Sequence, residues 1–458
     1  MQHMKKLFSV VLVVVLAFSL AACAGNSNNG NNTDPGNSSA NEPSNNTGNA
    51  TTNNDAGDGS DQEEVTIRLL WWGSQTRHDL TLEAIKLYEE NNPHVTIEPE
   101  FTGWSGYWEK LAAMVAGNNM PDVFAITVGE YLSQYAGKNL LADFGPFVDS
   151  GLIDLSNTSE SLIQSGEVNG TLYGIPLGMN ALTVIYDEQM IKDAGATPPS
   201  NDWTWEDWKS IAEDVHGSTG QYGTQALDVA NMFTYYARQH DQKLYNPEGT
   251  GLGHDDQTLA DFFSMVLEQQ EKGTYPTLDV VLQHEAVEDQ LIIHKKAPFD
   301  FRWSNQVIAL TNAAQRPLKL DPLPGPDHDK GAYLNPSMFF SISESSKVKE
   351  EAAKFINWWT NDIEANKILN GERGVPISSV VRDALMPNLD ETNQMVYEYI
   401  NYVSEHSSPI DTVVPPGAAE IESALSEVHE QVMYKQLTPE EGAAEYRKRA
   451  EEIIERNS

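Results

Sequence analysis

Two short runs carry residue types that metallopeptidases use, but each lacks part of the required arrangement. His284-Glu285 and His429-Glu430 begin like the motif His-Glu-x-x-His, in which two imidazoles four residues apart bind zinc from one helix face. Neither run has the second histidine at that position. The sequence also has no Gly-x-Ser-x-Gly turn for a serine nucleophile and no phosphate-binding loop. Motifs therefore give no support for catalysis, and we expect no cofactor and no metal site.

Aromatic residues beside small polar residues indicate a different chemistry. Trp104, after a predicted strand, and Trp303, in Phe301-Arg302-Trp303-Ser304-Asn305, each stand beside small polar residues. An aromatic ring stacks on the C–H face of a sugar, while neighbouring polar side chains bind its hydroxyls. Any tryptophan taken alone can equally be a core residue. We assign Trp72 and Trp108 to packing, and Trp104 and Trp303 to ligand contact.

Two arginines offer a second kind of contact. A guanidinium binds a carboxylate through two parallel hydrogen bonds, so Arg77 and Arg373 would suit an acidic sugar. The alternative for both is an ion pair with one of the many acidic residues of the chain. The sequence leaves these two interpretations open.

The charge of the chain excludes several partners. Its 458 residues contain 29 Lys and Arg against 67 Asp and Glu, a formal net charge of −38. Binding to nucleic acid or to anionic lipid requires clustered basic residues, so neither is expected. Apolar residues make up 40% of the chain, which is enough for a folded core. We interpret the acidic excess as a solvated outer surface.

The amino-terminal region predicts export and a lipid anchor. Lys5 and Lys6 precede an apolar run over 7–20, which is short for a membrane span and typical of a signal peptide. The run ends in Leu20-Ala21-Ala22-Cys23, which resembles a bacterial lipobox, and Cys23 is the single cysteine. We expect a signal peptide over 1–22 and a lipidated Cys23. The alternative is an ordinary signal peptide with a chance cysteine.

The segment after this cysteine differs from the rest of the chain. Residues 23–62 are rich in Asn, Gly, Ser and Thr and show no apolar periodicity, so we expect a disordered tether. No other long apolar run follows it, so we expect no transmembrane channel.

Alternating patterns downstream predict an α/β body. We expect strands over 65–71, 94–101 and 122–126, separated by helices from Leu80 and from Trp108. Polar loops are expected between each strand and the following helix, over 73–79 and 103–107. In such sheets, ligands bind beyond the carboxyl ends of the strands, where these loops lie. Three later segments also predict helices. They are a capping box at Thr204–Asp207, an apolar stripe over 352–359 and a capped start at Thr438–Glu441.

In this order, the features resemble the extracellular solute-binding lipoproteins of ABC sugar importers, known as family 1 solute-binding proteins. The likeness covers roughly residues 64–458. It is carried by Pro121-Asp122-Val123, by the run over 172–180, by Val184-Ile185-Tyr186-Asp187, by Thr204-Trp205-Glu206-Asp207-Trp208, by the run over 351–356, and by Gly371-Glu372-Arg373-Gly374-Val375-Pro376.

The resemblance implies two α/β lobes joined by three crossovers, with the ligand in the cleft between them. Lobe 1 would comprise 63–180 with 326–385, and lobe 2 would comprise 181–325 with 386–458. It also implies a non-enzymatic, monomeric protein. A lipid anchor at Cys23 would hold it on the outer face of the cell membrane, in a Gram-positive organism. There it would deliver a plant-derived oligosaccharide to an ABC permease, closing by a hinge motion.

The segment Trp71–Asp79, with Asn92–Val95, looks like the subgroup that binds pectin fragments, notably unsaturated rhamnogalacturonan oligosaccharides. Arg77 would then bind the uronate carboxylate. Xylo-, arabino- and galacto-oligosaccharides are alternatives, as are a lipid-anchored polysaccharide-degrading enzyme and an adhesive surface protein. The expected ligand-binding residues are Ser74, Gln75, Arg77, Trp104, Tyr107, Thr127, Asn180, Tyr235, Trp303, Asn305, Asn335, Ser337 and Arg373.

Overall fold

The computed structural model of the chain describes residues 63–284 and 289–457. The predicted signal peptide, the lipidated Cys23 and the tether lie outside the described residues, as does most of the run that begins at His284. Within the described ranges, no helix combines the length and the apolar character that a membrane crossing requires.

The first strands form the predicted parallel sheet. β1 (Val65–Trp72) pairs in parallel with β2 (Val95–Thr102) on one side and with β3 (Val123–Ile126) on the other. α1 (Gln75–Asn91) and α2 (Trp104–Ala116) connect these strands. The carboxyl ends of the three strands therefore meet at one edge of the sheet, as the alternating pattern predicts.

The prediction of polar loops over 73–79 and 103–107, after β1 and β2, is wrong. The helices already begin at Gln75 and at Trp104, so most of 73–79 and 103–107 is helical. Ser74 is the N-cap of α1, and its hydroxyl accepts a hydrogen bond from the backbone N–H of Arg77 at 3.3 Å. The first turn of α1 is polar in sequence, so apolar periodicity does not detect it; that of α2 carries Gly and Ser beside its aromatic residues, a composition typical of loops.

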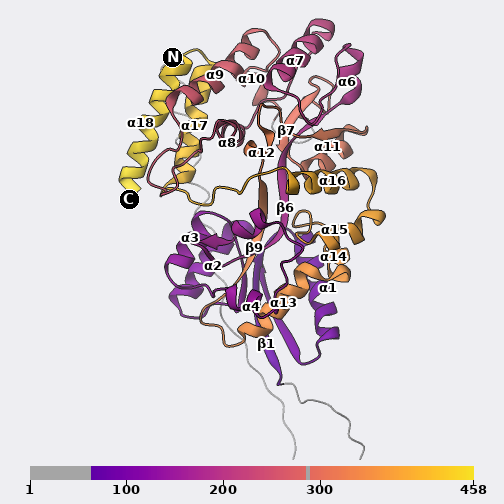
Figure 1. Ribbon diagram of the computed structural model, residues 1–458, viewed down its shortest axis with the longest axis vertical. Helices are drawn as coiled ribbons and strands as arrows, with labels where there is room; N and C mark the ends of the chain where they lie inside the picture. The colour runs from indigo at the N-terminus through magenta and orange to yellow at the C-terminus, as the bar shows by residue number, and fades with distance from the viewer. Residues whose placement is uncertain (1–62, 285–288, 458) are drawn as a thin grey trace, which may run out of the picture. The chain divides into compact units, whose positions relative to one another are not determined.

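A single long strand joins two parts of the fold. β6 (Ile175–Tyr186) pairs over 175–181 with β9 (Leu334–Ile342), which in turn pairs with β3. From Leu182 onward, β6 pairs instead with β7 (Phe299–Trp303) and β8 (Lys319–Asp321). In Figure 1, β6 and β9 lie side by side where the two groups of helices meet.

Two hydrophobic clusters form the cores of the two lobes. The first contains the side chains of β1, β2 and β3 and of the helices packed on them, and the second surrounds β7. The residues Val307, Leu310, Val396 and Ile400 pack with the first cluster. The helices that pack on the first cluster include α13 (Lys349–Asn361), α14 (Ile363–Leu369), α15 (Ser379–Leu385) and α16 (Glu391–Glu405). The helices that pack on the second cluster include α7 (Trp205–Thr219), α8 (Val229–Gln239), α9 (Asp256–Glu271), α17 (Ala418–Met433) and α18 (Pro439–Asn457).

The remaining elements are short. They are α3 (Glu130–Gly137), α4 (Gly145–Asp149), α5 (Glu160–Gln164), β4 (Glu167–Val168), β5 (Thr171–Leu172), α6 (Glu188–Asp193), α10 (Leu278–Val281), α11 (Gln306–Ala314), α12 (His328–Gly331) and a 3₁₀ turn at Met386–Asn388.

The helix starts predicted at Thr204 and at Thr438 are confirmed. At α7, the backbone N–H of Asp207 donates to the Thr204 hydroxyl, and the Asp207 carboxylate accepts from the Thr204 N–H. Thr438 and Glu441 form the same reciprocal pair at α18. Each such cap contributes about 1 kcal/mol to helix stability.

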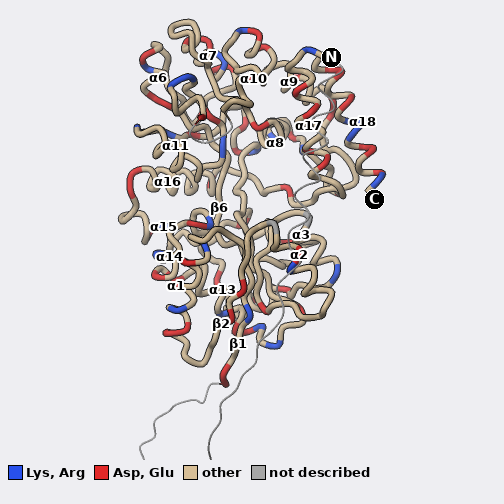
Figure 2. The backbone as a smooth tube through the Cα atoms, turned by 180° about the vertical axis from the view of Figure 1, so that it is seen from behind, with Lys and Arg blue, Asp and Glu red and all other residues tan. Residues whose placement is uncertain are grey.

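Charged residues are distributed over the outer helices. Figure 2 shows Asp and Glu spread along many described helices, with Lys and Arg interspersed. On α18, Arg449 pairs with Glu427 and Glu445, and Arg456 pairs with Glu420. Exposed pairs of this kind contribute little to stability, and their main effect is on solubility.

Candidate functional site

An aromatic cluster lies at the carboxyl edge of the first sheet. Trp72 ends β1, and Trp104 opens α2. The Trp104 ring stands edge-on to those of Trp72 and Trp108, with centroids 5.2 and 5.5 Å apart, and Trp108 stacks on Tyr131. Trp72 is buried, whereas Trp104 is 52% exposed. The cluster thus presents one exposed indole on a rigid base, and Trp72 serves packing as predicted.

The structure buries two of the predicted ligand residues. Tyr107 is fully buried, and its hydroxyl donates to the carbonyl of Ala125 at 2.5 Å. Tyr235 is also buried, and its hydroxyl donates to the carbonyl of Leu323 at 3.1 Å. Burial raises the pKa of both phenols well above the usual value. Both rings are therefore packed inside the hydrophobic cores, and neither has an exposed face that could contact a ligand.

A pocket of about 200 Å³ lies beside Trp303 in the second lobe. Trp303 ends β7, pairs in register with Leu182 of β6, and is only half-buried. The pocket is lined by Leu182, Ala226, Asp228, Asn231, Met232, Asp300, Phe301, Arg302, Trp303 and Gln306. It combines an indole with amide and carboxylate groups, which is the composition expected of a sugar site.

The charges in this pocket are largely paired. One Asp300 oxygen accepts from the Arg302 Nε at 2.7 Å, and Arg302 also donates to Gln290 at 2.6 Å. The other oxygen of Asp300, Oδ1, is buried without a hydrogen-bond partner among the described residues. Burial raises the pKa of this carboxyl group. Asp300 thus neutralises the charge of Arg302, while its Oδ1 atom accepts no hydrogen bond from another described residue.

The Trp303 ring packs against a second aromatic residue, Tyr333. The two rings stand edge-on, with centroids 6.2 Å apart. The guanidinium of Arg238 lies 5.1 Å from the centre of the Tyr333 ring. Arg238 is buried and also donates to the Asp411 carboxylate at 2.6 Å and to the Pro409 carbonyl at 2.9 Å.

The two predicted arginines are already engaged. The Nε of Arg77 lies 2.9 and 2.7 Å from the two carboxylate oxygens of Glu372, so this arginine forms an ion pair. Arg373 is buried, donates to the Thr81 hydroxyl at 2.6 Å and lies over the Trp359 ring. Burial lowers the pKa of Arg373 to about 9.

Several predicted polar residues lie where β6 and β9 pair. Asn180 stands opposite Asn335 in the register, and the Ser337 hydroxyl donates to the Gly178 carbonyl at 3.2 Å. The Asn180 side-chain oxygen is buried without a partner among the described residues. Thr127 follows β3 directly and is half-buried.

The other predicted residues are exposed. Ser74 caps α1, the Gln75 amide donates to Asp79 at 2.8 Å, and Asn305 precedes α11. Thus, of the thirteen predicted residues, the pocket described above contains only Trp303.

Sequence reasoning missed most of the lining of the Trp303 pocket. The missed polar residues are Asp228, Asn231, Asp300, Arg302 and Gln306. Asp228 carries a signal, since it is the N-cap of α8 and its carboxylate accepts from the Asn231 amide at 2.8 Å. The alternation in Phe301-Arg302-Trp303 also places Asp300 and Arg302 on one face of β7.

Solved structures of known proteins share this two-lobe α/β fold. A family 1 extracellular solute-binding protein from Alicyclobacillus acidocaldarius matches with a TM-score of 0.78 and 31% identity, over 86% of this chain and 99% of that one. An oligogalacturonide-binding protein from Yersinia enterocolitica matches with a TM-score of 0.71 and 21% identity, over 85% and 99%.

The chain belongs to the family of bacterial extracellular solute-binding proteins, whose model matches residues 73–365. This confirms the resemblance to extracellular solute-binding proteins, whereas the lipid anchor and the pectin subgroup stay predictions. The diacetylchitobiose-binding protein DasA of Streptomyces coelicolor is 22% identical over 399 residues, 84% of each chain. The chain spans 41% of the length of the curated putative binding proteins of Brucella, at 23% identity.

Proposed function

We propose that the protein is the substrate-binding component of an ABC importer and captures an oligosaccharide. The observation that carries this proposal is the exposed Trp104 at the start of α2 on one core and the half-buried Trp303 at the end of β7 on the other. Two indoles on two lobes suit a sugar chain held between them, because each ring stacks on one pyranose face.

Release to a permease requires that the lobes move. We propose that β6, β9 and the chain around α16 form the crossovers, and that lobe 1 is 63–180 with 326–385 and lobe 2 is 181–325 with 386–458. Closure around the ligand would be a hinge motion at these crossovers. The protein would act as a non-enzymatic monomer, anchored through Cys23 on the outer face of the membrane of a Gram-positive cell.

The charge pattern favours a neutral sugar chain. Arg77 is paired with Glu372, and Arg302 is paired with Asp300. A uronate that bound the Nε edge of either arginine would have to displace one of these carboxylates, whereas a sugar hydroxyl needs no unpaired cation. We therefore place xylo-, arabino- and galacto-oligosaccharides first.

One observation keeps the pectin fragment as the second candidate. The hydrogen bonds of Arg77 within the described residues use its Nε and Nη1. The Nη2 group is thus available to a carboxylate such as that of an unsaturated rhamnogalacturonan fragment.

Calorimetry with purified protein tests whether the protein binds an oligosaccharide and whether it prefers a neutral or an acidic one. We expect saturable binding of at least one neutral oligosaccharide, with no loss of affinity in salt. Tighter binding of the rhamnogalacturonan fragment, weakened by salt, would instead favour the second candidate. Release of shortened sugars at enzymatic rates would contradict the non-enzymatic assignment, and binding of no member of the panel would contradict the sugar site.

A further inference from the structure

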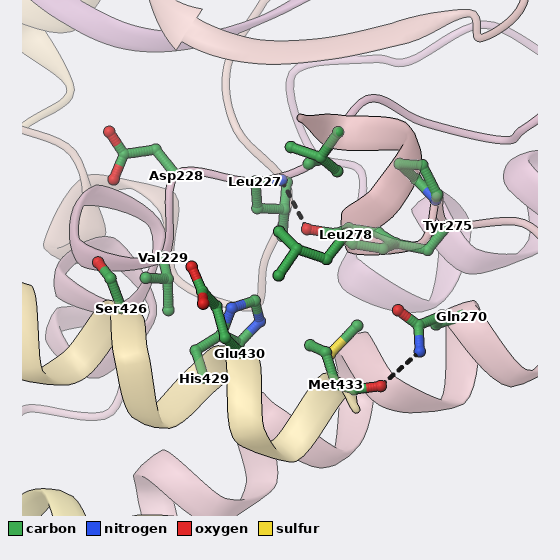
Figure 3. Close-up of a pocket in the computed structure, with 13 residues that line it drawn as sticks. Leu227, Asp228, Val229, Gln270, Tyr275, Leu278, Ser426, His429, Glu430 and Met433 are labelled. Carbon is green, nitrogen blue, oxygen red and sulfur yellow. Dashed lines mark hydrogen bonds between the residues drawn. The ribbon is translucent and has the colours of Figure 1, made fainter. Parts of the chain in front are cut away.

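A second cavity in the second lobe adjoins the Trp303 pocket and shares Ala226 and Asp228 with it, but His429 and Glu430 line only the second cavity. It has a volume of about 370 Å³ and lies between the loop before α8, α10 and the carboxyl-terminal half of α17. Figure 3 shows the side chains of His429 and Glu430 rising from α17 toward Leu227 and Leu278. The volume is within the range of small-molecule sites.

One end of this cavity is apolar. Leu227, Leu278, Val281 and Met433 line it, and the ring of Tyr275 lies beside them. The Tyr275 hydroxyl accepts a hydrogen bond from the Leu227 N–H at 2.8 Å, which fixes the position of its ring and leaves its O–H proton able to donate. This end can hold a hydrocarbon or an aromatic ring by contact alone.

The other end is acidic and holds one free imidazole. Asp228, Glu430 and Ser426 gather there with His429 (Figure 3). Neither the His429 ring nor the Glu430 carboxylate has a hydrogen bond or ion pair to another described residue. Burial lowers the pKa of His429 to about 4, so at neutral pH the ring is uncharged and has a nitrogen that accepts hydrogen bonds.

The described lining of this cavity contains no lysine or arginine. The two nearest lysines along α9 and α17 are engaged elsewhere: Lys272 with Glu213 and Glu268, and Lys435 with Glu271. The carboxylates at the polar end are therefore not neutralised from within the pocket, and a neutral imidazole does not repel a cation there.

We propose that this cavity is a binding site for a small organic ammonium ion that carries an apolar body. The ammonium group donates to the Glu430 carboxylate and to the His429 ring, and the apolar body lies against Leu227, Leu278 and Met433. Charge complementarity at one end and apolar walls at the other select this class over a neutral or anionic compound of the same shape.

Three probes of matched shape test the site: phenethylammonium, phenethyl alcohol and phenylacetate. We expect saturable binding of phenethylammonium by calorimetry, up to about fivefold weaker binding of the alcohol, and no binding of phenylacetate, since Glu430 is exposed and an exposed ion pair contributes up to about 1 kcal/mol. Equal affinity for all three probes, or no saturable binding of phenethylammonium, would overturn the proposal.

Two variants locate the contact. Glu430→Gln should weaken phenethylammonium binding by up to about fivefold, whereas Glu452→Gln, which removes an exposed carboxylate of α18 outside the pocket, should not change it. His429→Phe should also weaken binding while keeping the ring that packs near Phe263. Oligosaccharide affinity should be unchanged in Glu430→Gln, so the outcome is separate from that of the sugar site. Identical losses in Glu430→Gln and Glu452→Gln would show unspecific charge attraction and refute the site.

Discussion

The guanidinium of Arg238 lies 5.1 Å from the centre of the Tyr333 ring, and this side chain links the support of Trp303 to the segment after α16. Tyr333 directly precedes β9 and stands edge-on to Trp303. Arg238 also binds Ser408, Pro409 and Asp411 in the segment after α16. One buried side chain thus fixes the start of a crossover strand, the segment that follows α16 and the support of a ligand-facing indole.

Replacing Arg238 should therefore affect both stability and affinity. Arg238→Met leaves the Asp411 carboxylate with Lys243 alone and removes the bonds to 408–409, so we expect a loss of about 3 kcal/mol in unfolding free energy. Arg238→Lys keeps the charge but not the planar fork, and should lose less stability while still weakening sugar binding. Denaturant unfolding and calorimetry measure the two effects. Wild-type affinity in Arg238→Lys would contradict a role in positioning Trp303.

Removing the exposed indole should weaken binding without unfolding the protein. Because Trp104 is 52% exposed, Trp104→Ala should cost less than about 1 kcal/mol of stability. Loss of one stacking contact should lower sugar affinity by about 1–2 kcal/mol, close to tenfold. Leu282→Ala, at an exposed apolar position outside the site, is the matched control. If both variants bind sugar equally well, Trp104 is not a ligand residue.

Asp300 should decide the charge preference of the Trp303 pocket. Asp300→Asn removes the carboxylate that neutralises Arg302. Affinity for neutral oligosaccharides should fall, and affinity for uronate-containing fragments should rise, each by about tenfold if one charged hydrogen bond changes. Calorimetry with one neutral and one acidic oligosaccharide checks this. A parallel loss for both ligands would indicate damage to β7 rather than a change of specificity.

Glu372 should be required for stability at the start of α1. Its carboxylate pairs with Arg77 and lies 3.7 Å from Arg373, whose side chain is buried and has Nε and Nη1 without a hydrogen bond among the described residues. Glu372→Gln leaves two guanidinium groups close together, so we expect a loss of about 2–4 kcal/mol. Glu364→Gln, in an exposed pair with Lys367, should cost less than about 1 kcal/mol. Thermal unfolding compares the two.

His328 should make the protein less stable in mild acid. Burial lowers its pKa to about 4 from an ordinary value of 6.5. Because the unfolded chain binds the proton first, the contribution is complete above pH 6.5 and falls as the pH drops toward 4, by up to about 3 kcal/mol. His328→Gln should flatten the profile of unfolding free energy in this window, and exposed His294→Gln should not. An unchanged slope in His328→Gln would refute the assignment.

Local patterns predict much of the fold because they act over a few residues. The alternation in β1 and the caps at Thr204 and Thr438 are properties of neighbouring side chains, so the parallel sheet and the helix starts follow from them. The first turn of α1 was missed because its residues are polar, and that of α2 because Trp104 and Tyr107 stand there with Ser and Gly, which are typical of a loop. Trp72, a packing residue by prediction, is buried in the aromatic cluster.

The site depended on contacts that sequence spacing does not encode. Arg77 pairs with Glu372, which is 295 residues away along the chain. That ion pair determines whether the charge of Arg77 is free for a ligand. Tyr107 and Tyr235 look like loop aromatics in the sequence, yet folding buries both rings. The sequence alone determined the family, the α/β class and the residue types available to a sugar. Only the tertiary structure decided which of those side chains are exposed, paired or buried, because burial and ion pairing are set by residues that are distant along the chain.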